Sequence, residues 1–494
     1  MTDETGIQDL VDSVAVVTRS LRCPSDLNPF ARRESHPLLL PSSLLYNKDV
    51  SVSRRYQLSG STAREIAASI ETGIRQGHLN PGDGLPTVRA AAAVLRVSPV
   101  TVASAYRLLK TRGFVSADGR RGTRITQAPA LTLRHSAPLP EGVRDLAQGN
   151  PDPDLLPSLA GALEAVDPAP SLYGEYANLP ELIEVARLDL VADGIDASSL
   201  AVVGGAADGM ERVLGANLRP GDKVAIEDPS FTRVIDLMGA MGFTPLPIAI
   251  DEFGMLPGAL GGALDTGANA VIITPRAQNP TGAALDANRS KQLLAVLAMR
   301  PDVLVIEDDH AGPVAGPSEE AGVLTLCADR LRWSTIRSVS KFLGPDLRLA
   351  VLAGDPVTVA RVDGRQRIGT GWVSHILQQI VAHLWSDPKA PQLFARAKAS
   401  YSSRRESLVD ELMKRAIAAT GRSGLNVWIE VAEEAETVRA LMQRGWAVAP
   451  GERYRMESRP ALRVTSAALR EGEAETFAED LAAILRPQAR TYSA

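Results

Sequence analysis

The sequence predicts an α/β protein with two folded parts: a small basic unit of three helices and two strands, and a larger domain around a mostly parallel sheet. Two observations lead to this prediction. Residues 56–126 change from helical to strand-like spacing of apolar residues and carry ten basic against four acidic residues, a net charge of +6. Beyond about Leu146, β-branched apolar runs alternate with Ala- and Leu-rich helical stretches, which is typical of a parallel sheet covered on both faces.

Length and composition limit the class of protein. A chain of 494 residues predicts about three domains, and 45% hydrophobic with 22% charged residues argues against wholesale disorder and fibrous structure. The two cysteines, Cys23 and Cys327, are too few for a disulfide framework and suit a reducing compartment. No apolar run approaches the roughly 18–20 residues that span a bilayer, and the first residues are acidic where a secretory signal would be basic. We therefore expect a cytoplasmic protein with no membrane partner.

Local signals define the elements of the basic unit. Capping residues and apolar spacing predict three helices, at residues 61–76, 88–95 and 98–109. Two strands around a hairpin tip follow, at residues 113–116 and 123–125. Because a four-residue turn joins the second and third helices, the pattern indicates a winged helix-turn-helix.

A winged helix-turn-helix binds DNA by placing its third helix in the major groove while the wing holds phosphates. We expect Ser98 and Thr101, near the start of that helix, to reach bases or phosphates, and Arg89 to bind phosphate. The wing supplies further phosphate ligands, namely Arg120, Arg121 and Arg124. Double-stranded DNA is the expected partner, and two half-sites imply a homodimer. The alternative is that these arginines form a solvated face on a small helical domain.

The same unit resembles the GntR class of regulators. The resemblance rests on residues 77–89, on Val97-Ser98-Pro99-Val100-Thr101-Val102 and on Gly113-Phe114-Val115. It covers the whole unit of about 70 residues, and it implies DNA binding.

Several stretches of the larger domain carry residue types that suit one cofactor chemistry. Lys341 follows Ser338-Val339-Ser340, and a lysine amine can form a Schiff base with an aldehyde. The serine hydroxyls and Arg348 suit a dianionic phosphate. Residues 204–207 precede a predicted helix, so their backbone amides can also hold phosphate.

Two further stretches supply contacts for a ring. Asp308 and Asp309 end an apolar strand, where a carboxylate can keep a pyridine nitrogen protonated. Asn279 begins an Asn-Pro-Thr-Gly turn, and its amide can hydrogen-bond a ring oxygen. Each feature alone has an ordinary reading: a surface lysine, a strand-end turn or metal ligand, and a simple turn.

Together these stretches resemble the fold-type I aminotransferases, which bind pyridoxal 5′-phosphate (PLP), from about Asp145 to Leu485. The resemblance implies a large domain with a smaller C-terminal α/β subdomain. It assigns Lys341 to the Schiff base and the catalytic role, Asp308 to the pyridine nitrogen, Asn279 and His310 to the ring hydroxyl, and Phe231 to stacking on the ring. It assigns phosphate binding to Ser338, Arg348, Gly205, Ala206 and Ala207, and an amino acid's carboxylate to Arg463.

Two departures from that family change expectations. His310 stands where relatives often carry tyrosine, and because histidine titrates near neutrality we expect a pH-sensitive contact. Ala206 and Ala207 lack the polar side chain often found at the phosphate site, so we expect weaker phosphate binding. The remaining histidines show no metal-ligand spacing, and no metal site is predicted.

The combination of the two parts resembles the MocR regulators across nearly the whole chain past residue 55. It divides the chain into an extension (1–55), a DNA-binding unit (56–126), a linker (127–144) and an aminotransferase-like effector domain (145–490). The resemblance implies a PLP-dependent DNA-binding transcriptional regulator that senses a small amino compound, or PLP itself, by amine exchange at Lys341. Two alternatives stay open: a working aminotransferase acting on an amino acid, and a regulator that has lost PLP.

Overall fold

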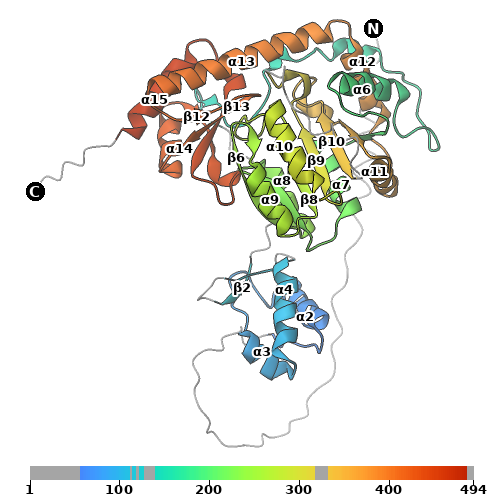
Figure 1. Ribbon diagram of the computed structural model, residues 1–494, viewed down its shortest axis with the longest axis vertical. Coiled ribbons are helices and arrows are strands. Elements are labelled where there is room, and N and C mark those ends of the chain that lie inside the picture. Colours follow the sequence, from blue (N-terminus) through green and yellow to red (C-terminus); the bar gives the residue numbers. More distant parts are fainter. Residues whose placement is uncertain (1–55, 112–113, 118–121, 127–138, 317–331, 487–494) are drawn as a thin grey trace, which may run out of the picture. The chain divides into compact units, whose positions relative to one another are not determined.

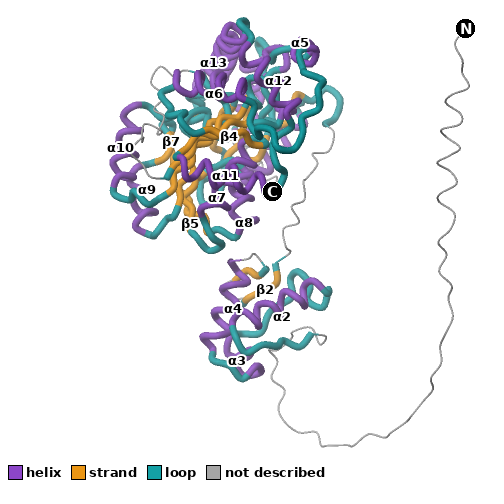
Figure 2. Tube along the Cα trace, turned by 90° about the vertical axis from the view of Figure 1, so that its right-hand side faces the viewer, coloured by secondary structure: helices purple, strands orange, loops and turns teal. Residues whose placement is uncertain are grey.

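The computed structural model describes residues 56–111, 114–117, 122–126, 139–316 and 332–486. Figures 1 and 2 present the described elements in two views at right angles. The predicted extension (1–55), most of the predicted linker (127–138), and Arg120 and Arg121 of the predicted wing lie outside the described residues.

The N-terminal unit is a winged helix-turn-helix. Its helices are α2 (Ala63–Arg75), α3 (Val88–Leu95) and α4 (Pro99–Thr111), and its wing pairs β1 (Val115–Ala117) with β2 (Thr123–Ile125) antiparallel. Thr62 caps α2 through a capping box with Glu65, which explains the sharp start of that helix. Ile66 and Ile70 are fully buried between the helices. The predicted helices and strands are therefore confirmed, and the second helix has the predicted bounds.

An eight-stranded sheet forms the centre of the larger domain, in the order β4-β11-β10-β9-β8-β5-β6-β7. Neighbours from β10 to β6 pair in parallel, while β11 and β7 pair antiparallel with their neighbours. The strand bounds are β4 (Leu200–Val203), β5 (Lys223–Asp228), β6 (Thr244–Asp251), β7 (Gly254–Met255), β8 (Ala270–Ile273), β9 (Leu304–Asp309), β10 (Trp333–Ser338) and β11 (Ala350–Gly354). The mostly parallel sheet is as predicted.

Both faces of this sheet are covered by helices, as Figure 1 shows. Alternate residues of β8 point to opposite faces: Ala270 and Ile272 pack in one cluster with α7, α8 and α11, and Val271 and Ile273 pack in another with α9 and α10. This burial of both faces explains the continuous apolar runs in the sequence. The helix bounds are α7 (Ala206–Asn217), α8 (Thr232–Met241), α9 (Pro257–Asp265), α10 (Ala287–Ala298) and α11 (Pro356–Ile368).

A third core cluster lies where the helices α5 (Ala160–Glu164), α6 (Pro180–Ala192), α12 (His375–Ser386) and the long α13 (Ala390–Lys414) pack on the sheet. One short 3-10 turn, Gly312–Val314, follows β9, and another, Pro345–Leu347, lies between β10 and β11. Helix α13 belongs to two cores, because Phe394 and Tyr401 pack in this cluster while Leu408 and Leu412 pack in the C-terminal one.

The C-terminal part of the domain is a smaller α/β unit. Its antiparallel sheet has the order β12-β13-β16-β15, covered by α13, α14 (Glu434–Gln443) and α15 (Glu473–Leu485). The strands are β12 (Ala419–Thr420), β13 (Asn426–Glu430), β15 (Ala449–Pro450) and β16 (Ala461–Thr465), and β14 (Trp446–Ala447) pairs with β3 (Arg144–Asp145). The predicted smaller subdomain is therefore present.

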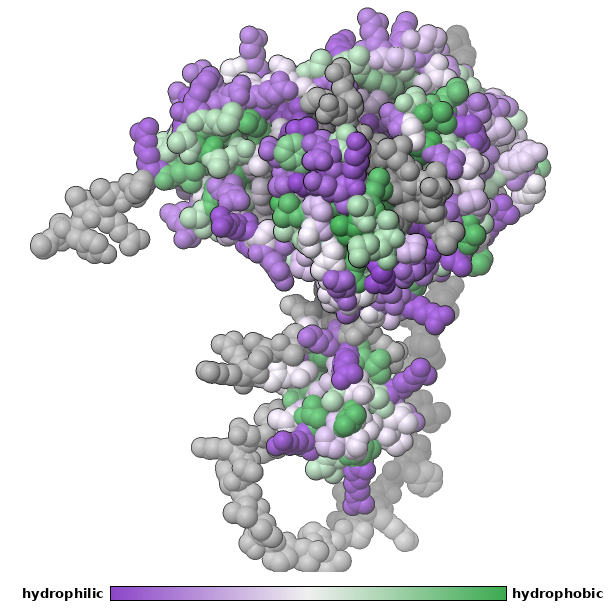
Figure 3. Space-filling model, viewed as in Figure 1, coloured by the Kyte–Doolittle hydropathy of each residue, from purple (hydrophilic) through white to green (hydrophobic). Residues whose placement is uncertain are grey.

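Hydrophilic side chains cover much of the face of this domain seen in Figure 3, with apolar side chains between them. In the described part of the chain, no single helix is long and apolar enough to cross a membrane. Among the same residues, one pair of helices bent relative to each other, Val88–Leu95 and Pro99–Lys110, has the required length and composition when the two are taken together.

Candidate functional site

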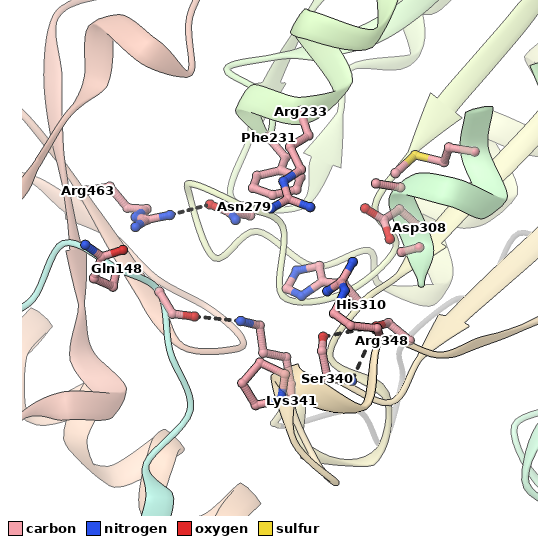
Figure 4. Close-up of a pocket in the computed structure, with 16 residues that line it drawn as sticks. Gln148, Phe231, Arg233, Asn279, Asp308, His310, Ser340, Lys341, Arg348 and Arg463 are labelled. Carbon is pink, nitrogen blue, oxygen red and sulfur yellow. Dashed lines mark hydrogen bonds between the residues drawn. The ribbon is translucent and has the colours of Figure 1, made fainter. Parts of the chain in front are cut away.

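A cavity of about 230 Å³ opens at the carboxyl ends of the parallel strands, between the large sheet and β16 of the C-terminal unit. Nearly all residues predicted for the cofactor and effector line it: Ala206, Ala207, Phe231, Asn279, Asp308, His310, Ser338, Lys341, Arg348 and Arg463. Gly205, the remaining predicted residue, immediately precedes α7. Side chains from sequence positions more than 250 residues apart thus meet in one cavity (Figure 4).

The part of the cavity predicted to hold phosphate is formed by the start of α7 and by the loop after β10. Gly205 has a φ of +102°, and a Cβ there would lie 2.9 Å from Nη2 of Arg348. The positive φ favours glycine at this position. The Ser340 amide donates to Ser338 Oγ at 3.3 Å, and the two hydroxyls lie 3.0 Å apart. Helix-start amides, hydroxyls and a guanidinium together suit a phosphate dianion.

Asp308 supplies the test of whether the cavity fits PLP. Its side chain is buried, and among the described residues its Oδ1 has no hydrogen-bond partner. Burial, followed by the negative charge of Asp309, raises the pKa of Asp308 to about 7. A buried carboxylate oxygen without a partner is unfavourable, and a pyridinium N–H would provide the missing donor. The residues present therefore fit the cofactor.

Asp309 has a different environment from its neighbour. Its carboxylate accepts hydrogen bonds from Arg276 and from Arg337 Nε, each at 2.8–2.9 Å. Burial alone would raise the pKa of Asp309, but the two guanidinium groups hold it below its ordinary value. Of the two adjacent aspartates, only Asp308 lines the cavity, which supports its assignment to the ring nitrogen.

Lys341 lies in the loop after β10, and its Nζ donates to the carbonyl oxygen of Gly149 at 2.6 Å. Burial lowers the pKa of Lys341 to about 8, and the positive charges of Arg463, Arg233 and Arg348 contribute in that order. A lowered pKa leaves more of the amine neutral near pH 7–8, which is the nucleophilic form.

His310 differs from the sequence-based expectation. Its Nε2 lies 2.8 Å from the carbonyl oxygen of Ala277, so Nε2 carries the proton in the neutral ring. Burial and the positive charge of Lys341 lower the pKa of His310 to about 4. The expected pH sensitivity near neutrality is therefore wrong, because the imidazole stays neutral throughout that range.

Arg463, on β16, is held in place on several sides. Its Nη1 donates to Asn279 Oδ1 at 3.2 Å, its Nη2 donates to the carbonyl of Ala147, and its guanidinium lies 4.9 Å from the ring centre of Tyr454. The Asn279 amide nitrogen is then the group left to donate to a ring oxygen. An arginine fixed in this way is preorganised for a carboxylate.

Sequence reasoning missed five residues that line the same cavity: Gln148, Gly149, Met210, Arg233 and Pro345. Ser340, whose hydroxyl was expected to suit a phosphate, also lines it. Arg233 points into the cavity from the first turn of α8 (Figure 4). Arg233 could have been found because it lies two residues after Phe231 in the first turn of a helix. A positive charge is unfavourable at a helix start, where acidic residues are preferred.

The predicted DNA-contacting residues have mixed roles. Ser98 caps α4, because the Thr101 amide donates to Ser98 Oγ at 3.1 Å and the two hydroxyls lie 2.8 Å apart. Arg124 on the wing donates to the carbonyl of Gly82 at 2.8 Å, so it also anchors the loop between α2 and α3. Arg89 is exposed on the first turn of α3. Among the described residues, no group of three or more His, Cys, Asp or Glu is arranged to hold a metal ion.

Comparisons with known protein families match both parts of the chain. Residues 62–125 match the family of bacterial regulatory proteins called the gntR family. Residues 141–481 match the family called aminotransferase class I and II. This domain implies pyridoxal phosphate binding.

Individual relatives extend this result. The chain is 38% identical over 427 residues to the vitamin B6 salvage pathway transcriptional repressor PtsJ of Salmonella typhimurium, covering 86% of this chain and 98% of that protein. It is 28% identical to the transcriptional regulator TauR of Rhodobacter capsulatus, covering 79% and 89%.

Among solved structures, kynurenine aminotransferase from Pyrococcus horikoshii matches with a TM-score of 0.65 at 19% identity, covering 70% of this chain and 91% of that chain. That likeness establishes the fold. The full-length match to a regulator and the matches to both families establish more: the chain belongs to the MocR-type transcriptional regulators, which join a GntR helix-turn-helix region to an aminotransferase class I and II domain.

Proposed function

We propose that this protein is a PLP-dependent, homodimeric regulator that binds operator DNA and responds to a small amino compound or to PLP itself. The observation that carries the proposal is the cavity, in which Lys341, the unpartnered Asp308 oxygen and Arg463 occur together in a chain with a helix-turn-helix. A DNA partner also implies a cytoplasmic location. For the domain bounds we propose 56–126 for DNA binding, 127–144 for the linker and 145–490 for the effector domain.

The side chains of the cavity have separable tasks in this proposal. PLP, when bound, supplies an aldehyde that reacts with amines and a ring that withdraws electrons. Lys341 provides the amine for attachment, Asp308 holds the proton at the ring nitrogen, and Phe231 packs against the ring. Arg348, Ser338 and the amides at the start of α7 hold the phosphate. Arg463 selects effectors that carry a carboxylate, because its guanidinium can accept one in a bidentate geometry.

Sensing requires two conformations of the protein that bind the effector with different affinity. Arg463 belongs to the C-terminal unit, whereas Asp308 ends β9 of the large sheet and Lys341 lies in the loop after β10. A ligand that contacts both units therefore favours one arrangement of them over others. The name of the PtsJ relative, a repressor of vitamin B6 salvage, makes PLP or a related vitamer a candidate effector here.

An exposed aromatic and apolar surface supports the homodimer. Leu172, Tyr173 and Tyr176 are 65%, 94% and 80% exposed, and Tyr173 lies against Trp372 with ring centres 5.6 Å apart. Tyr176 and Trp372 line a hollow of about 1050 Å³ between residues 171–180 and 367–375. A surface of this kind commonly marks a protein–protein contact, and we propose a second copy of the chain as the occupant.

The experiment compares the parent protein with Lys341→Ala, both mixed with PLP. We expect a visible absorption band in the parent that is absent in the variant, and a gel shift on the DNA upstream of the protein's own gene that changes when PLP is added. No DNA binding in either state would overturn the regulator proposal. Absence of the band in the parent would favour the alternative of a regulator that has lost PLP.

A working aminotransferase is the second candidate, because the cavity holds the amine, the ring partner and the carboxylate ligand together. The two candidates differ in the second half-reaction, since a sensor needs no keto acid. Sustained amino-group transfer from an amino acid to a keto acid by the parent, lost in Lys341→Ala, would favour the enzyme. A single exchange without turnover would favour the sensor.

A further inference from the structure

A five-residue ion cluster lies directly behind one wall of the cavity. It consists of Asp189 and Asp193 at the end of α6, together with Arg276, Asp309 and Arg337. Arg337 binds three carboxylates at once: Nε lies 2.8 Å from Asp309, Nη1 2.5 Å from Asp189 and Nη2 2.6 Å from Asp193. Arg276 joins Asp309 and Asp193 at 2.8 and 2.7 Å. The cluster thus ties α6, β9, β10 and the loop after β8 to one another.

Members of the cluster alternate in sequence with residues that line the cavity. Asp309 lies between Asp308 and His310, and Arg337 immediately precedes Ser338. Arg276 immediately precedes Ala277, whose carbonyl binds His310. In β9 and β10 the side chains alternate between faces, so Asp308 and Asp309 necessarily point in opposite directions. Any displacement of the cluster therefore moves the backbone that carries the cofactor-facing side chains.

The energetics argue that the cluster does more than stabilise the fold. The side chains of Arg337, Asp309 and Arg276 are only 1%, 3% and 6% exposed. The free energy needed to remove such charges from water equals or exceeds the free energy gained from their attraction. Apolar residues of similar size would often stabilise the fold equally well. What the charges add is directional geometry, because each guanidinium fork fixes its carboxylate partners in one plane. The anionic Asp309 also contributes to the raised pKa of Asp308.

We propose that Arg337 and Asp309 are positioning residues for the cofactor site, and that they act through Asp308. Neither side chain lines the cavity. Arg337 and Asp309 are opposite each other where β10 pairs with β9. The ion pair between their side chains therefore holds the ends of the two strands in register. This inference rests on the proposed assignment of Asp308 to the ring nitrogen.

The test is a double-mutant cycle on PLP affinity. Arg337→Met is made in the full-length parent and in Asp308→Asn, and the PLP dissociation constant is measured by quenching of protein fluorescence. We expect Arg337→Met to weaken PLP binding about ten- to hundredfold in the parent, as is typical when supporting groups behind a site are lost. In the Asp308→Asn background the same change should weaken binding less than about threefold, because the group through which it acts is already gone.

Arg289→Met is the matched control. Arg289 also forms a bidentate ion pair, with Asp251 at 2.8–2.9 Å, and its side chain is 12% exposed. It lies on α10 and does not line the cavity. We expect this variant to lower the melting temperature while leaving PLP affinity within about twofold of the parent. If Arg337→Met fails to fold, Arg337→Lys, which keeps the charge and loses the fork, and Asp189→Asn carry the same cycle.

Equal fold-changes for Arg337→Met in both backgrounds, or an unchanged PLP affinity in the parent background, would overturn the positioning role. Either result leaves the proposed regulator intact, since the parent would still bind PLP and DNA. A parent protein that binds no PLP would overturn both proposals together.

Discussion

Substitution of Asp308 by asparagine should stabilise the protein in the absence of PLP while weakening PLP binding. The pKa of Asp308 rises from 3.8 to about 7, mainly through burial. In the folded state the protonated form is therefore favoured. As the pH rises above 4 the unfolded chain releases its proton freely, so the free energy of unfolding falls until about pH 7 and is constant above it. Asparagine has the same shape as the protonated acid and cannot ionise.

The size of the effect follows from the same pKa. Each pH unit between the two values corresponds to about 1.4 kcal/mol, so the ionised Asp308 lowers the free energy of unfolding by about 4 kcal/mol at pH 8 and by less than about 2 kcal/mol at pH 5. The pKa of the buried Glu227 is also raised to about 7, mainly by burial, and the charge of Asp308 is the smallest of the causes. Glu227 therefore changes little between the two proteins.

The assay is urea unfolding of PLP-free parent and Asp308→Asn at pH 5 and pH 8, with PLP-loaded samples alongside. We expect the variant to be more stable without PLP, by a margin about 2–3 kcal/mol larger at pH 8 than at pH 5. With PLP, the parent should gain more stability than the variant. Asp265→Asn, at an exposed position on α9, is the control and should show no such dependence on pH. A variant less stable than the parent at pH 8, or an equal gain at both pH values, would refute the reasoning.

Three other outcomes follow from the described contacts. Tyr106→Phe removes a hydrogen bond of 2.8 Å from a largely buried hydroxyl to the carbonyl of Pro86, and should lower the free energy of unfolding by about 1 kcal/mol in denaturant titrations. Arg89→Ala should weaken DNA binding and reduce the slope of log binding constant against log salt concentration by about one. Arg124→Ala should weaken DNA binding and also lower the melting temperature, because Arg124 anchors a loop. Equal effects of the two variants on the melting temperature would contradict this. For His310→Gln, PLP affinity measured from pH 5.5 to 7.5 should follow the same pH profile as the parent, and a step near pH 6.5 seen only in the parent would contradict the lowered pKa of His310.

Much of the fold was predictable because local patterns and tertiary environment agree. The helix Val88–Leu95 and the strand Thr123–Ile125 have the predicted bounds, since capping residues, turn residues and apolar spacing all indicate the same ends. The predicted cofactor residues were named by resemblance from stretches far apart in the chain, and they meet at one end of the sheet because parallel strands present their carboxyl ends on the same side.

What could not be predicted depends on three-dimensional environment. The lowered pKa of His310 comes from burial, which no local pattern reports. Arg124 was predicted to contact DNA, but it also donates to the carbonyl of Gly82 in the loop between α2 and α3. Arg276 and Arg337 resemble ordinary surface cations in the sequence, and their shared binding of Asp309 requires that two separate strands be brought side by side.

Helix α13 has a mechanical consequence. Its 25 residues make a rod about 37 Å long at 1.5 Å per residue, with its first half packed in the core beside α12 and its second half in the core of the C-terminal unit. Because the helix is rigid, a tilt of about 10° about its midpoint displaces its two ends by about 3 Å each, in opposite directions. A small rotation of the C-terminal unit would therefore also move the residues packed around the opposite end of α13, because one rigid helix joins the two cores.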